Sequence, residues 1–217
     1  MNQILNYFGE KEEINNINLP KAKANNKYKI LFIIFSSLAC ISIFLFIFNI
    51  YQNSQNEQIS QKLVHSYSIS TLYAQDNGYT TQEASTSDPF VIGIIKIDKI
   101  NLNYPILSIS NNDLLDISVC RFAGPMPNEI GNLCIAGHNY VDYKLFSRLN
   151  ELLIGDEITI YDLSGNSINY SIYEKYETSP TDTSCTFQDT NNLKIVTLVT
   201  CNNVNGKRLV IHAKEIP

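Results

Sequence analysis

The stretch that decides the fold lies near the C-terminus, where residues 193–213 read LKIVTLVTCNNVNGKRLVIHA. Two runs rich in Val, Ile and Leu flank the polar segment 202–207, which contains an Asn-Gly turn pair. We predict a hairpin of two buried strands in which Cys201 faces Arg208. Directly opposed residues have Cβ atoms about 4.5–5.5 Å apart. The thiol and the guanidinium would therefore lie side by side at the end of a sheet.

The region from Phe90 to Pro217 repeats this strand-like pattern along its length. Short runs of β-branched and aromatic residues alternate with segments rich in Gly, Pro, Asn and Ser, which is typical of an all-β sandwich or barrel. Only 111–117 and 144–152 have a helical pattern, and both are short. The expected strands are 91–97, 102–109, 133–136, 157–161, 168–176, 193–200 and 208–213.

A second feature is the run ILFIIFSSLACISIFLFIFNI at residues 30–50, which has 21 positions without a charge. About 20 apolar residues span a bilayer as a helix. Five lysines precede the run and neither Lys nor Arg follows it until Lys62, which predicts a cytoplasmic N-terminus and an extracellular remainder. A cleavable signal sequence fits less well, because its apolar part is roughly 7–15 residues long. A lipoprotein signal ending at Cys40 also fits poorly, because the chain stays apolar beyond it.

These observations divide the chain into four parts. We expect a cytoplasmic tail at 1–29, a transmembrane anchor at 30–50, a juxtamembrane segment and linker at 51–89, and a folded catalytic domain at 90–217. Residues 51–89 are rich in Gln, Asn, Ser and Thr, as linkers often are. The net charge of −5 argues against a clustered basic surface, so we expect no nucleic-acid partner.

A candidate reactive site combines Cys201 and Arg208 with a histidine. A nearby cation favours thiolate over thiol, and Arg does not lose its charge. His138 follows the end of an expected strand, a position that active-site residues often occupy. His212 would lie within a strand on the same face as Arg208, so it stays an alternative. The plainer interpretation is a buried small Cys, a solvated edge Arg and a loop His, and spacing alone does not exclude it.

Three strings in this region resemble the signature of the sortases, which are membrane-anchored transpeptidases of Gram-positive bacteria. They are AGH at 136–138, TLVTC at 197–201 and KRLV at 207–210. The resemblance implies an all-β fold, namely an eight-stranded closed β-barrel with short helices, preceded by one transmembrane helix. The similarity also covers VIGIIKIDKINLNYPI at 91–106, FSRLNELLIGDEITIY at 146–161 and NLKIVTLVTC at 192–201.

Carried over residue by residue, the resemblance implies a cysteine transpeptidase. Cys201 would attack the Thr carbonyl of an LPxTG-like sorting signal and form a thioacyl intermediate. His138 would protonate the leaving amine, and Arg208 would orient the peptide and stabilise the oxyanion. The residues expected to bind the substrate are Ala136, Val199 and Thr200.

The resemblance also implies the partners. These are secreted proteins with a C-terminal LPxTG-like sorting signal, an amine acceptor such as a peptidoglycan precursor, and the cell membrane that holds the anchor. We expect no cofactor and no metal. Some class A sortases bind calcium, but scattered surface acids are the commoner explanation for the four candidate ligands. Those candidates are Glu129, Glu177, Asp182 and Asp189.

The sortase class stays open between class D and class A. The GHN string at 137–139 is similar to class B, but class B enzymes carry a long helical insertion, whereas only 177–192 separates the two expected strands here. Three rival functions also stay open: a cysteine peptidase that only hydrolyses, a silent binding domain, and a pilin-polymerising class C enzyme. Among the other cysteines, we expect Cys120 and Cys134 in the core and Cys185 exposed in a loop.

Overall fold

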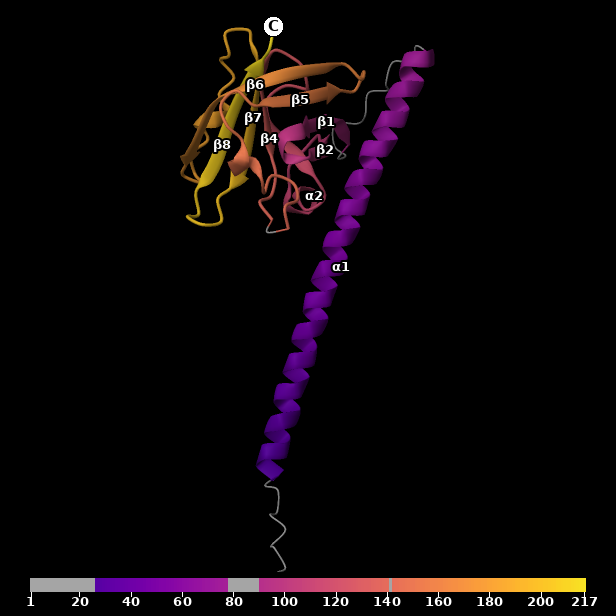
Figure 1. The fold of residues 1–217 in the computed structure, drawn as a ribbon, viewed down its shortest axis with the longest axis vertical. Coiled ribbons are helices and arrows are strands. Elements are labelled where there is room, and N and C mark those ends of the chain that lie inside the picture. The colour runs from indigo at the N-terminus through magenta and orange to yellow at the C-terminus, as the bar shows by residue number, and fades with distance from the viewer. Residues whose placement is uncertain (1–25, 78–89, 141) are drawn as a thin grey trace, which may run out of the picture. The chain divides into compact units, whose positions relative to one another are not determined.

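The computed structural model describes residues 26–77, 90–140 and 142–217 (Figure 1). The chain divides into two compact units, whose boundary in the sequence falls between Ile47 and Phe48. The boundary lies within helix α1 (Asn26–Asn77), and the second unit contains all the strands. The predicted tail up to residue 25 and the part of the predicted linker at 78–89 lie outside the described residues.

Helix α1 contains the predicted anchor at 30–50. The stretch Asn26–Ser66 is long and apolar enough to cross a membrane, with a mean hydropathy of 2.9 in its most apolar window. Between residues 30 and 51, consecutive apolar side chains are exposed, so they lie on all sides of the helix. A helix that is apolar all round needs either a protein core or lipid around it. This observation is consistent with a transmembrane helix.

Eight strands close into one β-barrel in the order β1-β2-β3-β4-β7-β8-β6-β5, which confirms the expected fold class (Figure 1). Most neighbouring strands are antiparallel, whereas β2 pairs with β3 and β4 with β7 in parallel. The strands are β1 (Val91–Ile97), β2 (Leu102–Leu107), β3 (Val119–Ala123), β4 (Gly131–Ala136), β5 (Glu157–Asp162), β6 (Ser167–Thr178), β7 (Lys194–Cys201) and β8 (Arg208–Glu215).

The short helices are single turns between the strands. Helix α2 (Asn112–Leu115) falls within the predicted 111–117, and the Asn111 side chain accepts a hydrogen bond from Leu114 N at 2.9 Å as its N-cap. The predicted helix over 144–152 is wrong, because only one 3-10 turn forms there. The three 3-10 turns are η1 (Asp98–Ile100), η2 (Leu149–Glu151) and η3 (Ser184–Thr186).

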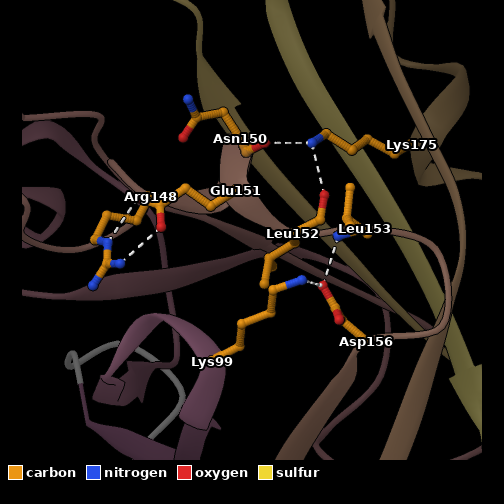
Figure 2. Close-up of polar contacts among 8 residues, drawn as sticks. All are labelled: Lys99, Arg148, Asn150, Glu151, Leu152, Leu153, Asp156 and Lys175. Atoms are coloured by element: carbon orange, nitrogen blue, oxygen red, sulfur yellow. Dashed lines mark hydrogen bonds and ion pairs between the residues drawn. The ribbon is translucent and has the colours of Figure 1, made fainter.

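Polar contacts explain why the segment before β5 does not form a longer helix (Figure 2). Lys175 Nζ on β6 donates to the carbonyl oxygens of Asn150 at 2.7 Å and Leu152 at 2.8 Å. In a helix those carbonyls would accept from amides four residues further along the chain. Asp156 holds the next turn, because its Oδ2 accepts from Lys99 Nζ at 2.6 Å. Tertiary contacts therefore override the local helical pattern.

Strand β3 was missed by the sequence analysis. It is five residues long, and Arg121 at its centre breaks the apolar pattern. Arg121 is half-buried, and its guanidinium donates to two carbonyl oxygens, of Ser108 at 3.2 Å and Gly124 at 3.1 Å. Backbone carbonyls of neighbouring segments therefore bind the charged side chain of this short strand. The sequence alone does not identify them as its partners.

A chain of hydrogen bonds runs over one face of neighbouring strands, from β6 across β8, β7 and β4 to the segment before β7. Asn132 on β4 donates to the carbonyl of Cys185 at 2.9 Å, so its Oδ1 faces Thr197 and accepts from that hydroxyl at 2.6 Å. The Thr197 hydroxyl then has only its lone pairs left for His212 Nδ1, which lies 2.8 Å away. His212 therefore carries its proton on Nδ1, and Nε2 accepts from the hydroxyl of Tyr176 at 3.2 Å.

The buried His212 gives a prediction about pH. Burial lowers the pKa of His212 below its usual 6.5. The unfolded chain therefore takes up this proton at a higher pH than the folded barrel does. The stability that neutral His212 contributes is complete above about pH 6.5 and is lost as the pH falls toward the lower pKa of the folded state.

We therefore expect the free energy of unfolding to fall more in the wild type than in His212→Gln when the pH drops from about 7.5 to 5.5. Urea denaturation of the detergent-solubilised chain at both pH values measures the two falls. The variant will be less stable at both, because it breaks the buried chain, so only the difference between the falls is informative. Equal falls would contradict the prediction.

Candidate active site

The β7–β8 hairpin has the predicted register, with Cys201 paired to Arg208. Cys201 is the last residue of β7 and is exposed, and Arg208 is the first residue of β8. Arg208 Nη1 donates to Cys201 Sγ at 3.8 Å. A guanidinium held against a sulfur stabilises negative charge on it and does not lose its own proton. The hairpin thus presents a thiol beside a fixed positive charge.

His138 lies at the same end of the barrel because β4 and β7 are parallel. Their pairing ends at Ala136 and Val199, so both strands reach this edge with their C-terminal ends. Two further bonds continue the register: Gly137 N donates to Val199 O at 3.2 Å, and the Thr200 hydroxyl donates to Gly137 O at 2.7 Å. His138 follows directly, so its backbone is fixed relative to the strand that carries the thiol.

Gly137 also brings this part of the backbone close to the core. A Cβ at Gly137 would lie 2.7 Å from Cδ2 of Phe146, a fully buried side chain. Phe146 N in turn donates to His138 O at 3.0 Å. The backbone on both sides of the His138 side chain is therefore packed or hydrogen-bonded.

Two residues that the sequence analysis missed surround the imidazole. His138 Nε2 lies 3.4 Å from Asp116 Oδ1, and the hydroxyl of Tyr140 donates to the same oxygen at 2.6 Å. The rings of His138 and Tyr140 are 5.2 Å apart. Burial, and then Asp116, raises the pKa of Tyr140, so its hydroxyl stays a donor. Asp116 is 22 residues from His138 in the sequence, and no local pattern links them.

Two cavities open on either side of the Cys201–Arg208 pair. The Arg208 cavity has a volume of about 310 Å³, and its lining includes Ala136, Val199 and Arg208 together with the segment between β6 and β7. The Cys201 cavity has a volume of about 620 Å³, and its lining includes Cys201, Tyr140 and the β7–β8 loop. Each residue of the pair therefore lines a different cavity.

Of the three predicted substrate-binding residues, two line a cavity and the third is buried. Ala136 and Val199 line the Arg208 cavity. Thr200 is buried, with an exposed fraction of 2%, and its hydroxyl is bonded to Gly137. His212, the alternative histidine, is also buried, and its two ring nitrogens contact the hydroxyls of Thr197 and Tyr176. These contacts favour His138 as the histidine of the site.

The other cysteines of the barrel are buried, as structural residues are. Cys120 and Cys134 are fully buried as expected, and burial raises the pKa of each to about 12. The expectation that Cys185 is exposed is wrong: only 7% of it is accessible, and burial raises its pKa. Its backbone carbonyl accepts from Asn132, and its side chain packs in a small apolar cluster with Val199 and Val210. All five cysteines of the chain are free thiols in the described ranges.

Three of the four acidic residues considered as calcium ligands have other contacts. Glu129 Oε2 accepts from Met126 N at 3.1 Å, and Asp182 accepts from Ser184 N at 2.9 Å. Glu177 accepts from two side chains of the β7–β8 loop. Within residues 26–77, 90–140 and 142–217, three or more His, Cys, Asp or Glu side chains nowhere gather as metal ligands would.

Comparisons with known proteins identify the family of the chain. Residues 95–216 match the Sortase domain family. Sortase A of Bacillus anthracis is 33% identical over 131 residues, which are 59% of this chain and 61% of that protein. The chain thus spans about three-fifths of the length of that relative.

Solved structures show the same barrel. A sortase D5 transpeptidase of Clostridium perfringens superposes with a TM-score of 0.65 at 31% identity, over 74% of this chain and 100% of that one. Sortase A of Listeria monocytogenes shares the fold with a TM-score of 0.54 at 24% identity, over 58% of this chain and 88% of that one. With a family match over more than half of its length, the chain belongs to the sortase family.

Proposed function

We propose that this chain is a cysteine transpeptidase that cleaves an LPxTG-like sorting signal and transfers the cleaved protein to an amine acceptor of the cell wall. The observation that carries the proposal is the contact of 3.8 Å between Arg208 Nη1 and Cys201 Sγ, at the barrel edge that also bears His138. A thiol, a fixed cation and an imidazole are the groups that two successive acyl transfers need.

The first transfer forms a thioester. Cys201 Sγ bonds to the carbonyl carbon of the substrate Thr, and the bond from that carbon to the following nitrogen breaks. The leaving amine takes a proton from the His138 imidazolium. In the second transfer the acceptor amine attacks the thioester and gives a proton to His138, the carbon–sulfur bond breaks, and the Cys201 thiolate is restored.

Arg208 has two roles in this proposal. Its guanidinium stabilises the oxyanion that forms in each transfer, an effect of about 3–4 kcal/mol for one well-placed donor. It also lines the Arg208 cavity, where Ala136 and Val199 offer apolar surface for the sorting signal. The similarity to a sortase D5, and the short segment between β6 and β7, support class D rather than class B.

The apolar stretch of α1 and the lysines before it support a membrane location. We propose a cytoplasmic tail at 1–29, an anchor at 30–50, a juxtamembrane segment and linker at 51–89, and an extracellular catalytic domain at 90–217. This orientation follows the positive-inside rule. It also places the active site where secreted proteins and cell-wall precursors meet.

The catalytic roles predict a graded set of variants. Cys201→Ala should abolish turnover of an LPxTG-like peptide, and His138→Ala and Arg208→Ala should each lower kcat/KM by about 10²–10⁴-fold. Arg208→Lys should restore only part of the loss, because a point charge cannot reproduce the planar fork. Peptide cleavage by the solubilised chain measures these effects. The control is Cys185→Ala, and the assignment fails if that variant is inactive while Cys201→Ala is not.

Transpeptidation and simple hydrolysis differ in their products. With a glycine-based amine acceptor present, the ligated peptide should exceed the hydrolysed one, and intact-mass analysis should show a thioester on Cys201 when the acceptor is omitted. A product that remains fully hydrolysed at every acceptor concentration would identify a peptidase instead.

The orientation can be tested on intact cells. Protease added outside should remove the barrel and leave only the membrane helix with its short cytoplasmic tail, because the site faces outward. Immunoblotting with a tag at each end of the chain reports the fragments. Protection of the C-terminal tag, with protease active on a known surface protein, would reverse the proposed orientation.

A further inference from the structure

Two asparagine side chains connect the segment after His138 to Cys201 and to the β7–β8 loop that follows it. Asn139 follows His138, and its Nδ2 donates to the backbone oxygen of Cys201 at 2.7 Å. Asn203 Nδ2 donates in the opposite direction, to the backbone oxygen of Asn139, also at 2.7 Å. A carbonyl oxygen can only accept, so the amide nitrogen must face it in both contacts. These two bonds are called the asparagine bridge below.

The β7–β8 loop is itself hydrogen-bonded to β6. The bridge therefore joins two segments that are both held by the barrel. The Glu177 carboxylate on β6 accepts from the side-chain amides of Asn202 and of Asn205, the latter at 2.8 Å. These hydrogen bonds lower the pKa of Glu177, so the carboxylate stays ionised and keeps both contacts in mildly acidic conditions. The loop is closed further by Asn202 N, which donates to Lys207 O at 2.7 Å.

The bridge spans a gap that regular strand pairing does not cover. The β4–β7 ladder ends at Ala136 and Val199, and the last backbone bond between these strands comes from Gly137. Beyond that point, the segment after β4 carries His138 and the end of β7 carries Cys201. The Asn139–Cys201 bond joins the residue after the imidazole directly to the backbone of the thiol residue.

We propose that Asn139 is a positioning residue that holds His138 at the distance from Cys201 which proton transfer needs, with Asn203 as the second half of the same device. The inference rests on the proposed function, because it concerns the geometry of those two groups. Neither amide belongs to the reacting groups, so both act through His138. Misplacing a catalytic group by about 1 Å can cost roughly 10²-fold in rate.

The position of the bridge predicts which kinetic constant it affects. Asn139 and Asn203 line the Cys201 cavity, whereas Ala136, Val199 and Arg208 line the cavity assigned to the sorting signal. Loss of the bridge should therefore slow the chemical step and leave peptide binding nearly unchanged. A residue that served only the general stability of the barrel would not separate these two constants.

The sharpest test is Asn139→Asp, which keeps the shape but replaces the donor by a carboxylate oxygen facing the Cys201 carbonyl. With an LPxTG-like peptide and the full-length solubilised chain, we expect kcat and the single-turnover rate of thioester formation to fall about 10- to 100-fold. KM should stay within about twofold. Asn139→Ala, which removes the donor without adding a charge, should fall between the wild type and Asn139→Asp.

The matched control is Asn103→Asp, the same chemical change at an exposed position of β2, and it should behave as the wild type. Asn203→Asp breaks the second bond from the loop after β7 and should lower kcat in the same direction, which keeps the test valid if Asn139→Asp does not fold. Thermal unfolding of each variant identifies a general loss of stability.

The outcomes separate the two proposals. If the wild type forms no thioester, the proposed function has failed. If the wild type forms it and both Asn139→Asp and Asn203→Asp keep kcat within twofold, the bridge has no positioning role. A rise in KM with unchanged kcat would likewise overturn the inference, because the bridge would then serve peptide binding.

Discussion

The parallel pairing of β4 with β7 is the constraint on which the site depends. Six residue pairs, from Gly131–Lys194 to Ala136–Val199, hold the two strands in register, and both strands are largely buried. Parallel strands end at the same edge, so one ladder delivers the histidine and the cysteine together. The antiparallel β7–β8 hairpin then adds Arg208 opposite the thiol. His138 thus shares one edge with Cys201 and Arg208, although it lies far from both in the sequence, because of two strand pairings.

The same ladder also fixes a wall of the Arg208 cavity. Asn132 on β4 donates to the backbone oxygens of Cys185 at 2.9 Å and Phe187 at 3.2 Å, in the segment that lines the Arg208 cavity. Its amide oxygen is held by Thr197 on β7. A buried polar group must keep its partners, since leaving one unsatisfied costs about 1–3 kcal/mol. The cavity wall and the strands that carry Cys201 and His138 therefore form one hydrogen-bonded unit.

How much could be predicted from the sequence depends on how local each feature is. The Cys201–Arg208 register follows from two strong strands and a short loop, and His138 follows from a strand end with a glycine. Strand β3 was missed because Arg121 hides its pattern, and the burial of Cys185 was missed because its carbonyl partner, Asn132, is 53 residues away. Asp116 likewise reaches the site only through the fold.

Exposed ion pairs hold the side chains at this edge of the barrel less firmly than neutral hydrogen bonds do. The His138 and Asp116 side chains are 35% and 51% exposed, and ion pairs this open to water contribute only about 0–1 kcal/mol. A guanidinium near the thiol also disfavours a second cation nearby, so attraction alone would not bring an imidazolium toward it. Neutral bonds do not have this conflict. Amide contacts such as that of Asn139 with the Cys201 carbonyl hold the two backbone segments together whatever the charges on imidazole and thiol.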